Sequence, residues 1–453
     1  MLTIQALCRA FDRQDDFFHR PIQAGEQTVH ICYIDGMVSV SEITDQILRP
    51  LAGLQPSSLR ELYDLAMNGQ VYGAGARSCD TVEQATSLLL AGYAVLVIPG
   101  TAAAAFEVKP PTFRGPQTPQ VENTVKGPKD AFVENIRTNT ALVRRHLPRP
   151  DLRLREVDVG STRVAVLWLE QEAREELPRR MLQRLTSLRV PALLTPASAE
   201  EGITGSRLTA FPLLSYTERP DRLCQGLLQG RVAVLVSGLP LGYLAPADLG
   251  TLMVSPEDEG TDFISASFVR ILRYGALLLS LLLPGAYVAM TLFHQEMIPL
   301  PLLRAIIRSK ESVPFSTAAE VMALLLAFEL LQETGLHLPK SVGQSVSLIG
   351  GIVVGTAAVE AALISPAALI MVSIAGVCGF ALPNRDLANA LRLWRFFLAW
   401  LGAVGGLFAV TCGALALVIH LAGLTTLDHP YLAPLAAGYA PPLRKRVKNQ
   451  DDS

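Results

Sequence analysis

Hydrophobic and polar residues are distributed differently in the two halves of this chain. Before about residue 263, charged residues are frequent and apolar residues come in short runs, whereas from 274 to 303 and from 341 to 384 charged residues are scarce. Short apolar runs that alternate with amphipathic stretches are typical of α/β domains, and long uncharged runs are typical of transmembrane helices. The pattern predicts an α/β cytosolic region of two related subdomains followed by an α-helical multi-spanning membrane domain.

The first half repeats one arrangement. The segments TVHICYIDGMVSVSEITDQILRPLAGL and TRVAVLWLEQEAREELPRRMLQRLTSL each contain an early β-branched and aromatic run, at 29–33 and 164–168, that leads into an amphipathic helical pattern. A second such run follows in each copy, at 94–99 and 232–237. The repeat predicts two subdomains that arose by duplication. The expected boundaries are 1–20 for an N-terminal segment, 21–112 and 149–262 for the subdomains, and 113–148 for a bridging linker and basic helix.

The bridging stretch VENTVKGPKDAFVENIRTNTALVRRHLPRP combines a helical pattern with positive charge. Pro128 is followed by a helical run that reaches Arg145. Two interpretations remain open: a solvated linker helix, or a helix that docks against a neighbouring subunit or acidic lipid headgroups. The candidate contact residues of this basic face are Lys126, Lys129, Arg137, Arg144 and Arg145.

Four apolar runs in the second half are candidate transmembrane spans, within a membrane domain expected at 263–426 and followed by a tail at 427–453. The segment 316–335 is different, because its uninterrupted apolar run is short and Glu329 and Glu333 follow it. Thr317 and Glu320 predict a capping box at its start. We expect this helix to lie at or dip into the membrane interface, with a complete span as the alternative. The four candidate spans are 274–293, 346–365, 367–382 and 396–424.

The charges that flank the runs give conflicting topologies. Arg270 and Arg273 precede the first run, and the N-terminus lacks the apolar stretch of a secretory signal, so the N-terminal region is expected in the cytosol. The basic C-terminal tail also favours the cytosol, which requires an even number of spans. Four spans, however, place the arginines between the third and fourth runs outside the cytosol. A fifth span at 316–335 would bring these arginines into the cytosol but would place the C-terminal tail outside. We prefer four spans; the arginines in question are Arg385, Arg392 and Arg395.

Glycine pairs predict close helix packing within the membrane domain. Gly351 and Gly355 lie in the second run, and Gly402 and Gly406 lie in the fourth. Each pair has GxxxG spacing, which lets helix backbones approach closely. The pairs favour a tightly packed bundle or an oligomer over a lone anchor.

Glu360 is a carboxylate inside an apolar run. At a helical period it shares a line with Thr356, while Gly355 and its small neighbours lie on another. A carboxylate in a span is costly unless it faces water or the interior of a bundle. The residue therefore indicates a pore or ion path, with a structural hydrogen bond or an extension to the headgroups as the alternative.

Composition narrows the function further. The formal net charge of -2 gives no support for nucleic-acid binding, and the six cysteines are scattered without a metal or redox spacing. Neither subdomain carries a phosphate-binding loop or a recognisable catalytic triad. We expect no enzymatic activity, no cofactor and no metal site.

The membrane half resembles the A subunit of the GerA family of spore germinant receptors. The resemblance rests on FVRILRYGALLLSLLLPGAYVAMTLFHQEMIPLPLL, on VPFSTAAEVMALLLAFELLQETGLHLPKSVGQSVSLIGGIVVGTAAVEAALISPA, on NALRLWRF and HPYLAPLA, and on the bridging VKGPKDAFVENIRTNTALVRR. It runs over roughly residues 115–440, and its motifs are long enough to be specific. It covers both a nutrient-receptor A subunit and the related SpoVAF-type paralogue.

The resemblance implies an integral, multi-pass protein of the spore inner membrane. Its partners would be a permease-like B subunit and a lipoprotein C subunit, and copies of the A subunit would form a ring around a ligand-gated channel for monovalent cations. The segment 343–365 would line the pore. The pore-lining candidates are Gln344, Ser347, Thr356 and Glu360.

Three departures from the family pattern and two rival functions accompany this resemblance. Thr356 stands where relatives often have glutamine, and Arg385 stands where they often have an aromatic residue after Pro-Asn. As a further departure, Arg304, Arg308 and Lys310 make the region after the first run unusually basic. An ion-coupled transporter would use Glu360 to bind the coupling ion, but transporters usually repeat their membrane halves and the repeat here is in the soluble part. A non-conducting scaffold would use Glu360 in an interhelical hydrogen bond.

Overall fold

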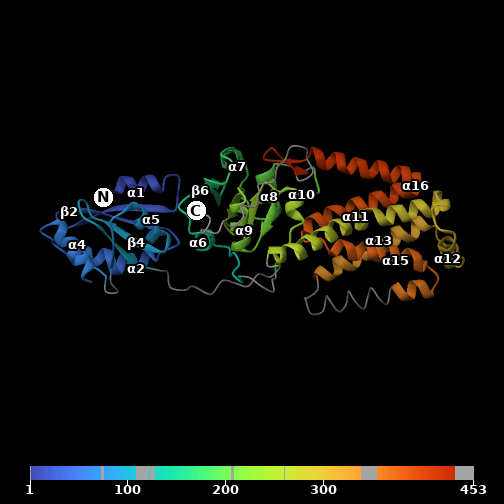
Figure 1. Cartoon of the computed structure of the whole chain (residues 1–453), viewed down its shortest axis with the longest axis horizontal. Helices are drawn as coiled ribbons and strands as arrows, with labels where there is room; N and C mark the ends of the chain where they lie inside the picture. Colours follow the sequence, from blue (N-terminus) through green and yellow to red (C-terminus); the bar gives the residue numbers. More distant parts are fainter. Residues whose placement is uncertain are drawn as a thin grey trace. The chain divides into compact units, whose positions relative to one another are not determined.

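The computed structural model describes residues 2–72, 76–108, 122, 128–205, 209–259, 261–337 and 355–433 (Figure 1). The chain divides into an α/β unit, built mainly from residues before Pro246, and a helical unit, built mainly from residues after Ala247. The division precedes the expected boundary at 262–263 because the short helix α10 (Leu249–Leu252) packs with the helices that follow it.

The first half of the α/β unit is a five-stranded antiparallel sheet with helices on both faces. Its strand order is β1-β2-β4-β5-β3. The strands are β1 (Phe17–Ala24), β2 (Gln27–Ile34), β3 (Ala76–Cys79), β4 (Tyr93–Val97) and β5 (Ala103–Glu107). The helices are α1 (Ile4–Ala10), α2 (Val40–Glu42), α3 (Arg49–Gly53), α4 (Leu59–Met67) and α5 (Val82–Leu90), with a π-helical turn at Ile43–Leu48.

Two hydrophobic clusters form on opposite faces of this sheet. Successive residues of a strand point to opposite faces, so Leu96 joins the cluster under α3 and α4, and Val95 joins the cluster under α1 and α5. Ser58 and Thr81 begin α4 and α5 by accepting hydrogen bonds from the amides of Glu61 and Gln84. The central strands are therefore buried on both sides, as their apolar runs predict.

The second half of the α/β unit repeats the same sheet. Its strand order, β6-β7-β9-β10-β8, matches that of the first sheet position by position. The strands are β6 (Leu152–Val159), β7 (Thr162–Leu169), β8 (Ser215–Thr217), β9 (Val232–Val236) and β10 (Gly242–Ala245). The helices are α6 (Ile136–His146), α7 (Glu176–Ser187), α8 (Pro196–Thr204) and α9 (Pro220–Leu228). The identical order supports the duplication predicted from the sequence.

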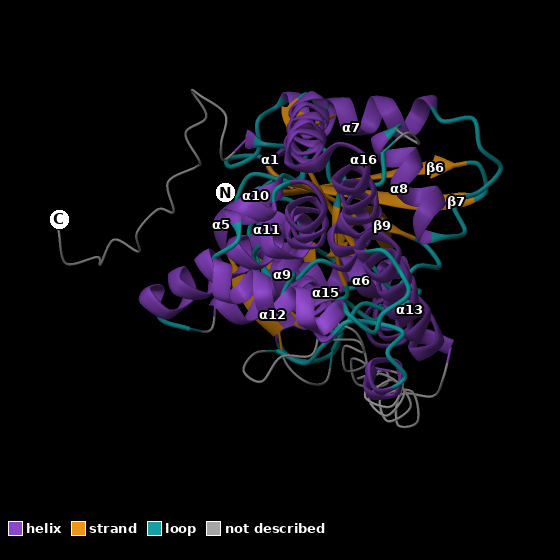
Figure 2. Ribbon diagram, turned by 90° about the vertical axis from the view of Figure 1, so that its right-hand side faces the viewer, coloured by secondary structure: helices purple, strands orange, loops and turns teal. Residues whose placement is uncertain are grey.

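The helical unit is a bundle of antiparallel helices, viewed along its length in Figure 2. A 3-10 turn at Pro256–Glu259 leads into its first long helix, and residues 355–360 form a further helical stretch. The helices are α11 (Phe263–Phe293), α12 (Leu300–Lys310), α13 (Thr317–His337), α15 (Pro366–Phe380) and α16 (Arg385–Gly423), with a 3-10 turn at Gln295–Met297. Two short strands, β11 (Thr425–Thr426) and β12 (His429–Pro430), follow α16.

The predicted fourth span, 396–424, is wrong as a single helix. The backbone leaves the helical conformation at Gly405 and at Gly406, where φ is 63°. A Cβ atom at Gly413 would lie 2.5 Å from a methyl carbon of Leu401, so the chain folds back on itself. The two arms, 385–404 and 407–423, are each about 25–30 Å long. A glycine pair at the centre of an overlong run is the turn signal that points to this hairpin.

Two of the described helices, α11 and α16, are long and apolar enough to cross a membrane, and α15 is a shorter apolar helix. The predicted first span lies within α11. The first part of the predicted second span, 346–354, lies outside the described residues. The structure thus supports membrane association. The number of spans stays an expectation, and the predicted fourth span is a hairpin of two arms.

Candidate functional site

The described end of the predicted pore segment exposes two of its four candidate residues. Thr356 and Glu360 lie on the helical stretch 355–360 and are both exposed. Glu360 makes no hydrogen bond or ion pair with any residue that the structure describes. Gln344 and Ser347 lie outside the described residues.

The predicted pore helix ends earlier than residue 365. Residues 361–364 turn, with Ala362 at a φ of 52°, and Ser365 caps the next helix, α15. Pro366 takes the first turn of α15, where its missing N–H costs nothing. Glu360 therefore stands at the last turn of its helix, beside the joint that leads into α15.

A buried carboxylate holds this joint. Glu320, in the first turn of α13, has a side chain that is 0% exposed and accepts hydrogen bonds from the amide (3.1 Å) and hydroxyl (2.7 Å) of Ser365. The Nζ atom of Lys310, at the end of α12, lies 3.1 Å from the other carboxylate oxygen of Glu320 and 2.6 Å from the hydroxyl of Thr317. The Glu320 clamp, which comprises Lys310, Thr317, Glu320 and Ser365, therefore joins α12, α13 and α15.

The geometry of the clamp corrects the expected capping box at the start of α13. The hydroxyl of Ser316 accepts the hydrogen bond from the amide of Ala319, so Ser316 is the cap. Glu320 turns away to Ser365 and Lys310. Apolar side chains of α11, α13 and α15 surround this cluster, so the charge of Glu320 depends on Lys310 for neutralisation.

A second carboxylate of α13 pairs with the arginines that complicated the predicted topology. The carboxylate of Glu329 lies 3.4 Å from the guanidinium of Arg392 and 3.6 Å from that of Arg395, which is 3% exposed. Both arginines belong to the helical bundle and not to a loop, and the positive-inside rule rests on loop charges. Arg385, at the start of α16, is exposed. Arg392 and Arg395 therefore do not require the third connection to face the cytosol.

One close contact between helix backbones involves Gly402, which the sequence pattern singled out, and Gly285, which it did not. A Cβ atom at Gly402 would lie 2.5 Å from the carbonyl oxygen of Gly285 in α11. Gly355 faces Leu369 of α15 at ordinary contact distance, and Gly351 lies outside the described residues. Gly406 forms the turn of the α16 hairpin, and a Cβ atom there would lie 2.8 Å from the ring of His294, just after α11. Gly402 and Gly406 both pack closely, but they do not share one continuous helix because the helix breaks at Gly405 and Gly406.

The basic helix α6 is buried between the two sheets of the α/β unit. Arg144 is 1% exposed, and its guanidinium donates hydrogen bonds to both carboxylate oxygens of Asp16 and to the Gln14 side chain (3.0 Å). Ala141 joins the core of the first sheet, and Leu142 joins that of the second. The solvated-linker interpretation is wrong for α6, and a contact with another subunit is wrong for Arg144, because both are enclosed within the chain.

The other basic candidates remain at the surface. Lys129 and Arg145 are exposed, and Arg137 is 61% exposed with its guanidinium 3.2 Å from Asp35. A Cβ atom at Gly36 would lie 2.9 Å from the carbonyl oxygen of Arg137, so the first sheet meets α6 closely here. Lys126 lies outside the described residues.

The N-terminal segment extends the second sheet, a role that the sequence pattern did not reveal. The amide of Asp15 donates to the carbonyl oxygen of Leu154 (3.0 Å), and its carboxylate accepts from the amide of Glu156 (2.8 Å) and from Arg155. The segment thus lies along the free edge of β6. Together with Arg144, it fastens the two subdomains into one body.

An ion pair between Asp258 and Arg273 holds the start of α11. Asp258 accepts hydrogen bonds from the guanidinium of Arg273 at 2.6 and 2.8 Å, and from the amide of Ser255 at 3.1 Å. Burial alone would raise the pKa of Asp258, but these hydrogen bonds outweigh burial and hold the pKa below its usual value of 3.8. Asp258 is therefore ionised at neutral pH.

The metal-ligand residue types and the cysteines of the described residues are expected to form no metal or redox site. The described residues contain no cluster of His, Cys, Asp and Glu that could hold a metal ion. Cys32, Cys79 and Cys224 are buried free thiols, and burial raises the pKa of Cys224 to about 12. Such thiols stay protonated and act as apolar core residues.

Comparisons with known proteins show the family to which this chain belongs. A family model described as "Bacillus/Clostridium GerA spore germination protein" matches residues 5–447. Spore germination protein KA of Bacillus subtilis (strain 168) is 33% identical over 93% of this chain and 79% of that protein. The uncharacterized membrane protein YfkQ of the same strain is 32% identical over 92% of this chain and 82% of that protein.

A solved structure also matches. It is the crystal structure of the N-terminal domain of the A subunit of the Bacillus megaterium spore germinant receptor GerK3, at 25% identity and a TM-score of 0.41. The match covers 54% of this chain and 93% of that domain. A TM-score of this size does not by itself establish a shared fold.

Proposed function

Because this chain belongs to the GerA family of spore germination proteins, we propose that it is the A-type membrane subunit of a spore germinant receptor. Several copies would enclose a ligand-gated ion channel that releases monovalent cations at the start of germination. The permease-like B subunit and the lipoprotein C subunit would complete the complex in the spore inner membrane, with the α/β unit in the cytosol.

Glu360 is the observation that carries this proposal. Glu320 and Glu329, two carboxylates of the neighbouring helix α13, are paired with Lys310 and with the two α16 arginines. Glu360 is exposed and has no partner among the described residues. An unmatched carboxylate in a membrane segment needs water, and a water-filled passage shared by several copies would supply it. With Thr356, Gln344 and Ser347 on the same segment, Glu360 would give the pore a polar wall.

The exposed basic residues beside α6 are the candidates for contacts between copies. Arg144 is excluded by its burial, which leaves Lys129, Arg137 and Arg145 among the described residues. Their charge lies on the α/β unit and can pair with acidic groups of a neighbour. Replacing Arg137 and Arg145 with serine should weaken crosslinking between copies in membranes, and unchanged crosslinking would place the contact elsewhere.

Potassium efflux from liposomes that hold the purified receptor complex tests the channel. Glu360→Ala and Thr356→Val should change the efflux rate while leaving the complex assembled, and the exposed Glu311→Gln should not. A complex that assembles but never releases potassium would favour the non-conducting scaffold. Efflux that requires a proton gradient in fixed ratio would favour the ion-coupled transporter.

A further inference from the structure

The helix α12 lies across the end of the bundle at which α11 finishes (Figures 1 and 2). The apolar run of α11 ends at Phe293, and α12 begins at Leu300. A run from 274 to 293 spans about 30 Å, the thickness of the hydrocarbon core. With the helical unit in a membrane, α12 is therefore at the level of the headgroups.

One face of α12 packs onto the bundle, and the opposite face carries two arginines. At roughly 100° per residue, Leu303, Ile306 and Lys310 share one side of the helix. Ile306 is buried among residues of α11, α13 and α15, and Lys310 reaches the Glu320 clamp. Arg304 and Arg308 project from about the opposite side and are both exposed.

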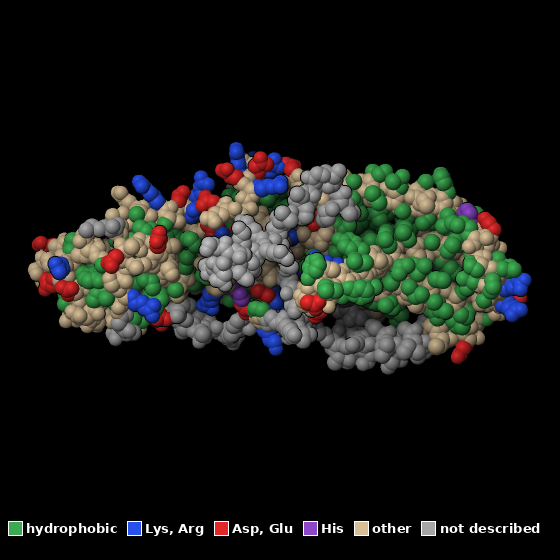
Figure 3. Space-filling view, viewed as in Figure 1, with side chains coloured by type: hydrophobic (Ala, Val, Ile, Leu, Met, Phe, Trp, Pro, Cys, Tyr) green, Lys and Arg blue, Asp and Glu red, His purple; other side chains and the backbone are tan. Residues whose placement is uncertain are grey.

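Apolar side chains flank the two arginines. Leu300 and Ile307, on one flank, are 56% and 49% exposed, and Leu302, on the other, is 50% exposed. In the space-filling view, hydrophobic side chains cover the visible face of the helical unit, and Lys and Arg gather at the end where α12 lies (Figure 3). An apolar body with a basic outer stripe is typical of a helix that lies in the membrane interface.

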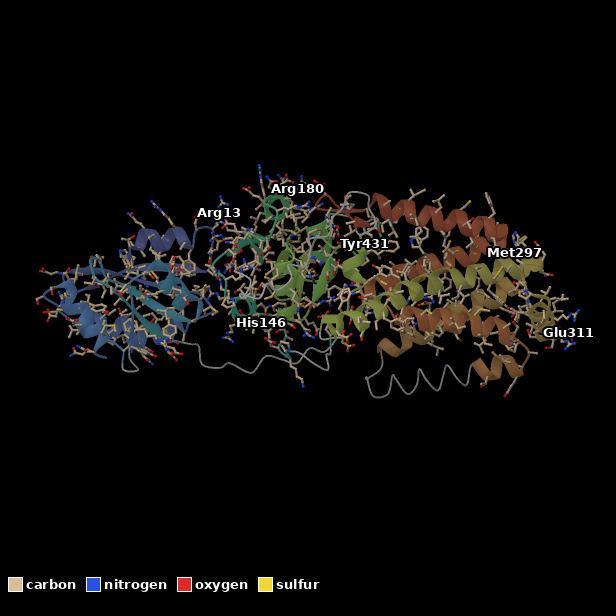
Figure 4. All side chains as sticks on the ribbon, viewed as in Figure 1. Arg13, His146, Arg180, Met297, Glu311 and Tyr431 are labelled. Atoms are coloured by element: carbon tan, nitrogen blue, oxygen red, sulfur yellow. The ribbon has the colours of Figure 1, made fainter. Side chains whose placement is uncertain are left out.

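No described carboxylate neutralises these arginines. Neither forms an ion pair with a described residue. The exposed Glu311 follows the last residue of the helix (Figure 4), and the exposed Glu296 precedes its first residue in the sequence. Like charges four residues apart on a helix repel each other. The helix dipole favours Arg308, in the last turn, but not Arg304, in the middle of the helix. An external anion would relieve the repulsion.

We propose that Arg304 and Arg308 form a binding site for the phosphate of an anionic phospholipid, with Leu300, Leu302 and Ile307 packed among its acyl chains. The planar guanidinium matches phosphate through paired hydrogen bonds, and the flanking apolar groups select a lipid over free phosphate. The site rests on the membrane location of the helical unit and is independent of ion conduction. Through Lys310, the lipid-binding helix is tied directly to the Glu320 clamp.

The test titrates dioleoylphosphatidylglycerol into the full-length protein in detergent and counts retained lipid by native mass spectrometry. The double variant Arg304→Gln/Arg308→Gln should bind roughly 30-fold more weakly, about fivefold for each arginine. The double variant Arg304→Lys/Arg308→Lys keeps both positive charges but loses the paired hydrogen bonds of the guanidinium groups. Its affinity for the lipid should lie between that of the parent and that of the glutamine variant. Dioleoylphosphatidylcholine should be retained poorly by every form.

The matched control is Arg9→Gln/Arg60→Gln, which removes the same charge from exposed positions of the α/β unit. It should retain the anionic lipid like the parent. The proposal is overturned if the Arg304/Arg308 glutamine variant retains the lipid fully, or if millimolar inorganic phosphate displaces it. It is equally overturned if lipid retention is unchanged and the variant instead loses a partner subunit, because the arginines would then serve a protein contact.

Discussion

Glu320 and Glu360 are carboxylates of one helical unit in opposite circumstances. Glu320 is enclosed, accepts two hydrogen bonds from Ser365 and faces the ammonium of Lys310. Glu360 precedes the same joint by a few residues, is exposed and has no partner among the described residues. A carboxylate that finds its cation inside the chain can fix a structure, whereas one that does not must be satisfied by its surroundings.

The contrast separates a structural role from a functional one. The Glu320 clamp holds the turn at 361–364 between the helical stretch 355–360 and α15, and so sets where Glu360 stands. Mutations at the two positions should therefore differ in kind. Loss of Glu320 should appear as instability, and loss of Glu360 as altered conduction in a stable protein.

The largest expected effect is that of Glu320→Ala. Removal of the carboxylate leaves Lys310 without its partner in an apolar setting, which should lower the free energy of unfolding by about 3–5 kcal/mol. Thermal unfolding of the protein in nanodiscs measures the loss. The exposed Glu311→Ala is the matched control and should change stability by no more than about 0.5 kcal/mol.

A double variant sharpens this prediction. Replacing the pair by apolar residues of similar size, Lys310→Met with Glu320→Leu, removes both charges and should recover most of the stability. If the double variant is as unstable as Glu320→Ala, the defect comes from the lost Ser365 contacts and not from an unpaired charge.

Arg144→Ala extends the comparison to the α/β unit. Asp16, whose side chain is 6% exposed, would lose the guanidinium with which it pairs, and the loss of one partner of a buried ion pair should cost about 3 kcal/mol. Hydrogen exchange of the full chain should speed up at Asp15 and Glu156, whose backbone bonds join the N-terminal segment to β6. Unchanged exchange at both amides would mean that Arg144 does not fasten the two subdomains.

A smaller effect is expected at the start of α11. Because the pKa of Asp258 is lowered in the folded protein, its stabilising contribution is complete above pH 3.8 and is lost as the pH falls further. Asp258→Asn should cost about 1.5–3 kcal/mol at neutral pH and abolish this acid sensitivity. Hydrogen exchange at residues 263–273, followed between pH 3 and 6 in the parent and the variant, measures the loss of stability and its dependence on pH. An identical pH profile in parent and variant would exclude Asp258 as the titrating group.

The sequence predicts local features of this protein well and long-range pairings poorly. The strand runs, the repeat and the apolar run at 367–382 depend on neighbouring residues, and the structure has strands, two matching sheets and the helix α15 there. The partners of Glu320 and Arg144 are 45 and 128 residues away, at Ser365 and Asp16, and no local pattern joins them. Glu320 therefore resembled a helix cap, and Arg144 resembled part of an exposed basic face.

Two further differences have physical reasons. The α16 hairpin escaped prediction because apolar arms on both sides of Gly405 and Gly406 read as one continuous run. Gly285 was missed because it lacks a GxxxG partner, although a Cβ atom there would lie 2.8 Å from the carbonyl oxygen of Leu398 in α16. Contacts with residues far away in the sequence, and not the local glycine spacing, determine which glycines form the turn and which pack against another helix.

The reversal potential of the complex in a planar bilayer tests the role of Glu360 most directly. A ring of carboxylates that faces water favours cations, and a ring of lysines opposes them. The account predicts a cation-selective current in the parent protein, a weakened or inverted preference in Glu360→Lys, and the same thermal stability in both. An unchanged reversal potential at full conductance in Glu360→Lys would contradict it.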